Sequence, residues 1–168
     1  MFVEGNYGTL YLDSNGLMVE NSWFVVNGNW MYFGDQGYMA KDTIIKGYWS
    51  DYYVDSNGIM VTNSWALVNG NWMYFDENGY IVRDTLIKGY WSDYYVDSNG
   101  IMVTNSWALV NGNWMYFDEN GYIVKNSFVK DSHGTVYLDE NGKMIFDKYI
   151  TDENGKHYID KNGYLVEN

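Results

Sequence analysis

Three pairs of tryptophans recur every 42 residues along the chain, and the two members of a pair lie seven positions apart. The pairs are Trp23 with Trp30, Trp65 with Trp72, and Trp107 with Trp114. The face of an indole ring attracts a cation, by about 0.5–2 kcal/mol per contact depending on desolvation. The same face can stack on the axial C–H groups of a sugar. With a tyrosine from the following hairpin as a third wall, each pair could form a box that binds a cation or a sugar.

The elements that must hold these rings repeat at half that distance. Eight glycines lie 21 residues apart, and each follows a tyrosine by five positions, so that the tyrosines are Tyr11, Tyr32, Tyr53, Tyr74, Tyr95, Tyr116, Tyr137 and Tyr158. A period of this length is typical of a solenoid, in which each unit packs its apolar face against its neighbours. We therefore predict an all-β hairpin-repeat solenoid of eight units of about 21 residues with a 42-residue super-repeat. The eight tyrosines, with Val19 and the equivalent valines, are predicted to form its structural seam.

Most units contain a turn of the form Asp-x-Asn-Gly, as at residues 76–79. Asn-Gly between two runs of β-formers is a strong hairpin signal, because both residues tolerate positive φ. The same letters resemble part of a calcium loop, but the further oxygen ligands and the distal glutamate of that loop do not follow. We expect a turn here, with no metal and no cofactor.

Composition excludes several classes of function. The net charge of −12 argues against nucleic acid, whose recognition needs lysine and arginine to neutralise phosphates. No apolar run is long enough for membrane insertion, and the absence of cysteine excludes disulfides and thiolate metal sites. The two histidines, His133 and His157, are not paired with a recurring serine, so we predict that the chain is not an enzyme. Aromatic residues make up 20% of the chain, more than a thin core can enclose, which favours binding.

All eight tryptophans fall between Trp23 and Trp114. Terminal repeats of a solenoid usually depart from the consensus because their outer faces meet water. We predict one repeat array over residues 1–168. Within it, residues 1–20 form an N-terminal capping unit, residues 21–125 the aromatic-rich binding units, and residues 126–168 degenerate C-terminal capping units.

The sequence NSWALVNGNWMYFDENGYI at residues 63–81 resembles the cell-wall-binding repeats of Gram-positive surface proteins. That family includes choline-binding modules, the glucan-binding repeats of glucosyltransferases and the repeat regions of large clostridial toxins. The resemblance implies hairpins stacked in a left-handed β-solenoid, with ligand sites between successive hairpins.

In choline-binding members of that family, a box takes two tryptophans from one repeat and a tyrosine from the next. Carried over, the resemblance implies two boxes: Trp23, Trp30 and Tyr52, then Trp65, Trp72 and Tyr94. The third pair, Trp107 and Trp114, meets Val136 at the matching position, so we expect that site to be weak or incomplete. Tyr53 and Tyr95 are the alternative third walls.

The alternate units depart from the family pattern. They carry Trp49 and Trp91 two positions away from the expected place, and these rings could belong to a different, sugar-stacking groove. The departure leaves choline and glucan open as ligands.

The predicted function is a non-catalytic surface-anchoring module that binds choline of cell-wall teichoic acid. One alternative is a module that binds an α-glucan or another polysaccharide, and a second is a structural spacer. We expect an extracellular location on a bacterial cell surface. No secretory signal is visible at residues 1–4 and the array begins at a unit boundary, so we expect a piece of a longer protein. The oligomeric state is left open.

Overall fold

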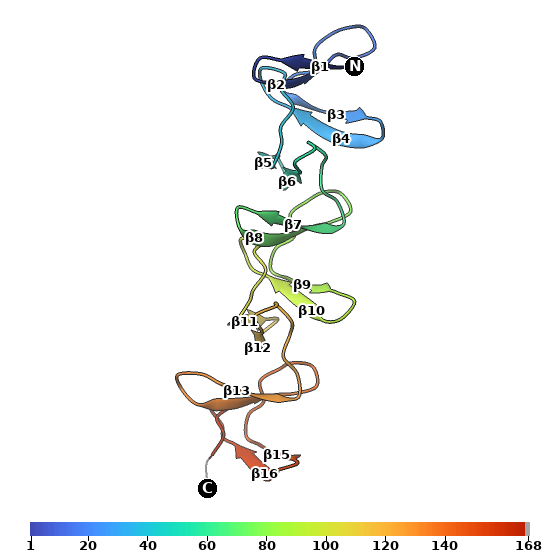
Figure 1. The fold of residues 1–168 in the computed structure, drawn as a ribbon. Helices are drawn as coiled ribbons and strands as arrows, with labels where there is room; N and C mark the ends of the chain where they lie inside the picture. The colour runs from blue at the N-terminus through green and yellow to red at the C-terminus, as the bar shows by residue number, and fades with distance from the viewer. Residues whose placement is uncertain (167–168) are drawn as a thin grey trace. The chain divides into compact units, whose positions relative to one another are not determined.

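The computed structural model describes residues 1–166, and in that range every regular element is a strand of an antiparallel hairpin (Figure 1). The prediction of an all-β hairpin-repeat fold is thereby confirmed. The same range contains no helix that could cross a membrane. The chain forms two compact units, which meet in sequence between Val82 and Arg83. The predicted capping and binding segments follow other boundaries and stay a prediction, and the last two residues of the C-terminal segment lie outside the described residues.

The first unit, residues 1–82, contains four hairpins in chain order. They pair β1 (Phe2–Gly5) with β2 (Gly8–Tyr11), β3 (Ser22–Val26) with β4 (Asn29–Phe33), β5 (Thr43–Lys46) with β6 (Asp51–Val54), and β7 (Ser64–Val68) with β8 (Asn71–Phe75).

The second unit, which begins at Arg83, repeats this arrangement. Its hairpins pair β9 (Thr85–Lys88) with β10 (Asp93–Val96), β11 (Ser106–Val110) with β12 (Asn113–Phe117), β13 (Ser127–Lys130) with β14 (Thr135–Leu138), and β15 (Lys148–Asp152) with β16 (Gly155–Ile159).

The ladder of a hairpin is closed at a different Asn-Gly pair from the one we predicted. In β7–β8 the reversal is at Asn69 and Gly70, with φ of 51° and 82°, as a two-residue turn of type I′ requires. The predicted turn at 76–79 does reverse the chain, but only a single bridge, Phe75 with Ile81, follows it. The ladder after this turn stays short because the chain leaves its own hairpin and joins a neighbouring one. There the N–H of Ile81 donates to the carbonyl of Asp51 at 3.0 Å.

The Asp-x-Asn-Gly turn is held by its own aspartate. Oδ1 of Asp76 accepts the N–H groups of Asn78 and Tyr80 at 2.9 and 2.8 Å. Gly79 has a φ of 80°, and a Cβ added there would lie 2.9 Å from the sulfur of Met60, a residue of the preceding repeat. Both the backbone angle and the close approach therefore explain why glycine recurs.

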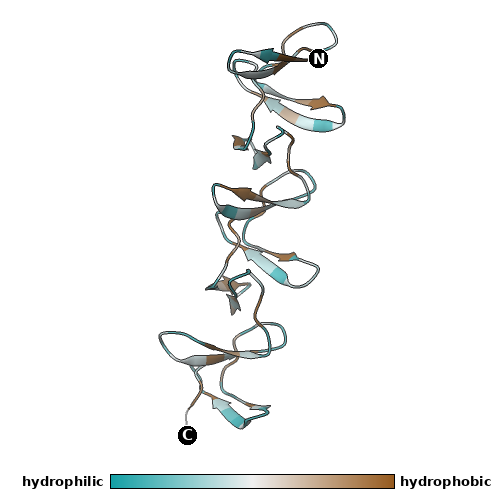
Figure 2. Cartoon of the chain, viewed as in Figure 1, coloured by the Kyte–Doolittle hydropathy of each residue, from teal (hydrophilic) through white to brown (hydrophobic). Residues whose placement is uncertain are grey.

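The core lies one residue beyond the repeating tyrosine. Seven residues that directly follow those tyrosines are completely buried: Phe33, Val54, Phe75, Val96, Phe117, Leu138 and Ile159. Adjacent strand residues face opposite sides, so the tyrosines themselves lie on the other face, most of them half-buried. Figure 2 accordingly shows hydrophobic and hydrophilic residues alternating within single strands. Of the predicted valine seam, Val19 is buried, the internal members are half-buried and Val166 is exposed.

Six of the repeating tyrosines, from Tyr32 to Tyr158, donate a hydrogen bond that spans their repeat. The hydroxyl of Tyr74 donates to Oδ1 of Asn63 at 2.9 Å, and that of Tyr116 to Asn105 at 2.7 Å. The acceptor lies eleven residues earlier and has a φ near 45°, a conformation that asparagine tolerates. The tyrosines are thus framework residues, as predicted.

Candidate functional site

The two tryptophans of a pair lie on one face of one hairpin. Trp23 is opposite Tyr32 in the register of β3 and β4, and Trp30 is opposite Val25. Since side chains alternate between faces with a period of two, Trp23 and Trp30 are diagonal neighbours on the same side. A two-residue turn between five-residue strands gives the seven-residue spacing seen in the sequence.

The first cavity, of about 530 Å³, opens over this face in the first unit. Tyr52 of β6 closes one side, with its ring centroid 5.2 Å from that of Trp23. Tyr80 continues the wall, 5.3 Å from Tyr52. Trp30 is 48% exposed, so one indole remains open to a guest. The remaining lining residues are Met60, Thr62, Glu77 and Asn78. We call this cavity one.

The lining of cavity one contains few charged groups. Burial raises the pKa of the Tyr52 phenol, and the neighbouring Tyr80 and Asp76 raise it further, so this wall is a neutral ring at physiological pH. The described lining contains one carboxylate, that of the exposed Glu77, and no basic side chain. Neutral aromatic faces beside a single acid suit a cation with apolar substituents.

The backbone fixes the open indole in place. The N–H of Met60, delivered by the turn after β6, donates to the carbonyl of Trp30 at 2.8 Å. The same bond joins Met144 to Trp114 at 3.0 Å in the second unit. The methionine side chain also lines the cavity in both places. In both places the methionine after an Asp-x-Asn-Gly turn therefore stacks the hairpins and completes the cavity wall.

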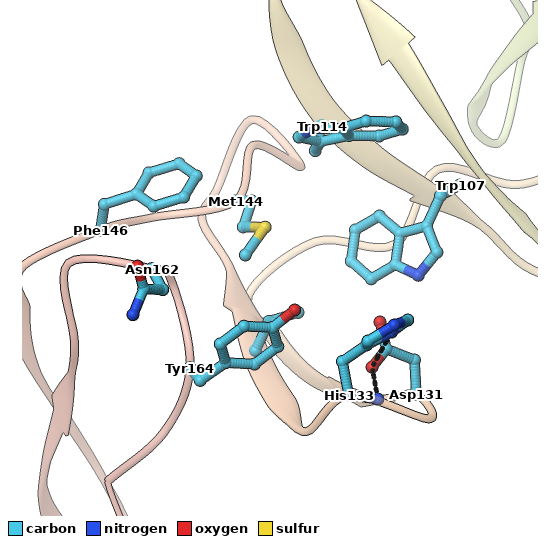
Figure 3. A pocket seen from close by; sticks show the side chains of 9 residues that line it. Trp107, Trp114, Asp131, His133, Met144, Phe146, Asn162 and Tyr164 are labelled. Carbon is cyan, nitrogen blue, oxygen red and sulfur yellow. Dashed lines mark hydrogen bonds and ion pairs between the residues drawn. The ribbon is translucent and has the colours of Figure 1, made fainter.

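A second cavity, of about 430 Å³, lies in the second unit over β11 and β12 (Figure 3). Trp107 faces Tyr116 across the hairpin and Trp114 faces Leu109, which again places both indoles on one side. Its other lining residues are Asp131, His133, Val136, Met144, Phe146, Asn162 and Tyr164. We call this cavity two. Val136 stands at the predicted tyrosine position, but Tyr164 supplies an aromatic wall from further along the chain.

The middle set of predicted residues is divided between the two units. Trp65 and Trp72 lie on β7 and β8 of the first unit, and Trp72 is 47% exposed. Tyr94 lies on β10 of the second unit, with its ring 5.5 Å from that of Tyr122. The middle box stays a prediction.

The alternative third walls, Tyr53 and Tyr95, are core residues. Each is 7% exposed and stacks on a buried phenylalanine, Phe75 or Phe117, at 5.9 Å. Burial raises the pKa of both phenols, and the carboxylates that accept their hydroxyls, those of Asp42 and Asp84, add to the effect. These rings are therefore taken up by packing and do not line either cavity.

Trp49 and Trp91 lie at hairpin tips, in the loops after β5 and β9. They are 84% and 81% exposed, and each forms an edge-on contact with the preceding tyrosine at 4.7 Å. Neither lines cavity one or cavity two. They are free-standing aromatic pairs.

Sequence reasoning missed Tyr80, Tyr164, Asp131 and the methionines as wall residues. Tyr80 and Tyr164 occupy the same repeat position, directly after a turn glycine and 84 residues apart. The recurrence can be seen in the sequence. Only the stacking of the hairpins shows that a tyrosine at this position reaches the indoles of a repeat earlier in the chain.

The fold and these cavities define an all-β repeat module with aromatic-lined cavities. A family model of choline-binding repeats matches residues 20–65 and 63–107, and a model of cell wall binding repeats matches residues 105–123. The chain belongs to the choline-binding repeat family, whose members are binding modules.

Several solved structures share the fold. Choline binding protein F from Streptococcus pneumoniae is 32% identical with a TM-score of 0.67, over 84% of this chain and 46% of that protein. CbpF in complex with ipratropium is 28% identical with a TM-score of 0.59, over 95% of this chain and 42% of that one. CbpJ from Streptococcus pneumoniae TIGR4 reaches a TM-score of 0.75 at 23% identity, over 95% and 56%, and supports the fold alone. The match thus spans less than half the length of choline binding protein F. A search of curated protein sequences finds no significant match.

Proposed function

We propose that this chain is a non-catalytic, surface-anchoring module that binds choline of cell-wall teichoic acid in its aromatic cavities. The observation that carries the proposal is the convergence of Trp23, Trp30, Tyr52 and Tyr80 from separate hairpins on cavity one. A trimethylammonium group has no N–H to donate, so its recognition depends on ring faces and shape. The net charge of −12 adds a field that favours cations.

The family assignment supports the same ligand class. One structural neighbour, CbpF, was solved in complex with ipratropium introduced by soaking. Weak sites repeated along one chain suit attachment to a polymer, since effective concentration turns several modest contacts into firm retention. We infer an extracellular location at a bacterial cell surface for the protein that carries this module.

The test is calorimetric titration of the full chain with choline. We expect saturable binding and a rise in melting temperature with choline concentration, because a ligand that binds only the folded state stabilises it. Trp30→Ala should remove the contribution of cavity one, whereas Trp49→Ala, an exposed tryptophan at a tip, serves as the matched control. Absence of any heat or thermal shift with the wild-type chain would contradict the proposal.

A polysaccharide-binding function is the second candidate, and the exposed tips favour it. Trp49 and Trp91 offer almost fully accessible ring faces, which suit stacking on sugars. Retention on an immobilised α-glucan that choline does not compete, and that is lost in the Trp49→Ala/Trp91→Ala double variant, would support this candidate. Unchanged retention in the double variant would remove it.

A structural spacer is the remaining alternative. It requires the half-exposed tryptophans to matter only for stability. If Trp72→Ala lowered the melting temperature but left retention on every ligand unchanged, that reading would be favoured over both binding functions.

A further inference from the structure

Cavity two differs from cavity one in the residue between its indoles and its distal tyrosine. In cavity one the ring of Tyr52 fills that place, 5.2 Å from Trp23 and 5.3 Å from Tyr80. In cavity two the residue 84 positions later is Val136, which is 1% exposed and has no ring. A space therefore opens between Trp107 and Tyr164 (Figure 3).

A charged hairpin tip lies at this space. Figure 3 shows Asp131 and His133 below the gap between Tyr164 and Trp107. They belong to the loop between β13 and β14, where the first unit has Gly47 and Trp49 in the equivalent loop. Where the first unit has the exposed indole of Trp49, the second unit has the imidazole of His133, which lines cavity two.

The carboxylate of Asp131 is held in position by its own loop. Its Oδ1 accepts the N–H groups of His133 and Gly134 at 2.7 and 3.1 Å, and Nδ1 of His133 lies 3.8 Å from the same oxygen. Among the described residues these contacts all end on Oδ1, so Oδ2 is the oxygen left for a guest. The side chain is only 28% exposed.

A partly buried carboxylate among aromatic walls interacts more strongly with a cation than an exposed one does, because less water screens it. It also gains most from a guest that donates a hydrogen bond, since charge-assisted bonds are the strong ones. A quaternary ammonium ion has no such donor, whereas a primary, secondary or tertiary ammonium ion has at least one. The neighbouring Trp114, Met144 and Phe146 offer apolar surface for alkyl groups.

We propose that cavity two is a binding site of its own chemistry, which takes alkylammonium ions that carry at least one N–H donor, with Asp131 accepting that donor. The site shares no residue with cavity one and extends the proposed function to a second class of ligand. Amino sugars and amino-alcohol head groups share this chemistry.

The test removes one methyl group at a time from choline. The full chain carrying Trp30→Ala and Trp72→Ala, which silence the other tryptophan pairs of the binding segment, is titrated at neutral pH with choline, N,N-dimethylethanolamine and ethanolamine. We expect dimethylethanolamine to bind about tenfold more tightly than choline, because it adds one charge-assisted hydrogen bond while keeping two methyl groups. Trp114→Ala in the same background should abolish binding and so locate the site.

Asp131→Asn should remove the preference, because an amide can still accept the loop N–H groups but lacks the charge. Glu119→Gln, in an exposed turn of the same unit, is the control for the loss of one negative charge. Circular dichroism and the melting temperature check that each variant folds. Equal or tighter binding of choline, a preference that survives Asp131→Asn, or no binding of any amine would overturn the proposal. Choline binding at Trp30 in the wild-type chain is measured separately, so failure of either proposal leaves the other standing.

Discussion

Cavities one and two are built on the same hairpin face and differ in what the following hairpins contribute. Trp23 with Trp30 and Trp107 with Trp114 take the same register positions, and the phenylalanine beneath each pair is completely buried. The third wall is a tyrosine ring in one and a valine beside an aspartate in the other. The comparison shows that a repeat can keep its framework while exchanging the few side chains that choose the guest.

The largest expected effect tests whether the two frameworks are equivalent. Phe33→Ala and Phe117→Ala each remove a side chain with 0% exposure, so each should lower the free energy of unfolding by about 3–5 kcal/mol. Denaturant unfolding of the two variants measures this. If the two decreases in the free energy of unfolding differed by more than a factor of two, the hairpin cores beneath the two cavities would differ, as well as the cavity linings.

Next in size is the loss of an open indole. Trp30→Ala should weaken choline binding at cavity one by at least about tenfold, because the ring offers the exposed face to the cation. Trp114→Ala should leave that affinity unchanged and remove amine binding at cavity two. Calorimetry with choline and dimethylethanolamine resolves the two losses. Identical ligand profiles for both variants would refute a difference between the cavities.

A smaller effect is expected from exchanging the third wall. Tyr52→Val should weaken choline binding about three- to tenfold, since one aromatic contact is lost. Val136→Tyr should shift cavity two toward choline, because the new ring would occupy the space between Trp107 and Tyr164. Titrating both variants with the methylation series checks the exchange, and an unaltered preference after Val136→Tyr would argue that Asp131 alone sets it.

The smallest effect concerns alkaline pH. The phenols of Tyr52 and Tyr53 have raised pKa values in the folded chain, mainly through burial. The stability they contribute is complete below the ordinary tyrosine pKa of 10.0 and is lost as the pH rises through the raised values. We expect the melting temperature to fall by about 2–4 °C per kcal/mol lost above pH 10. Tyr53→Phe should make the melting temperature fall less steeply with pH. An unchanged dependence of the melting temperature on pH would show that other groups cause the fall.

The glycine and tyrosine periods were enough to predict hairpins, because positive φ and a repeated apolar position are local requirements. The exact ladder was not predicted. In the repeats at residues 63–81 and 105–123 Asn-Gly occurs twice, and only inter-hairpin hydrogen bonds tell which copy closes the long strand pair. The buried position after each tyrosine was also missed, since Phe75, Val96 and Leu138 share a place and not a residue type.

The candidate site was predicted in part. The positions of Trp23, Trp30 and Tyr52 at one cavity agree with the set that the resemblance implies, although their role as ligand residues stays a proposal. Cavity two was expected to be weak because Val136 lacks a ring. That expectation considered one neighbouring repeat, whereas Tyr164 and Asp131 line the cavity from places that a single-repeat comparison does not cover.

By itself the sequence determined the repeat and the hairpin, since a turn with positive φ and a strand period of two are local requirements. Only the tertiary structure decided which rings meet, because Tyr80 and Tyr164 reach earlier hairpins through stacking and not through proximity in the chain. The tertiary structure also decided that Tyr53 is a core residue and that Tyr52 lines cavity one. Adjacent residues such as Tyr52 and Tyr53 face opposite sides of a strand, and what lies on each side depends on the neighbouring hairpins.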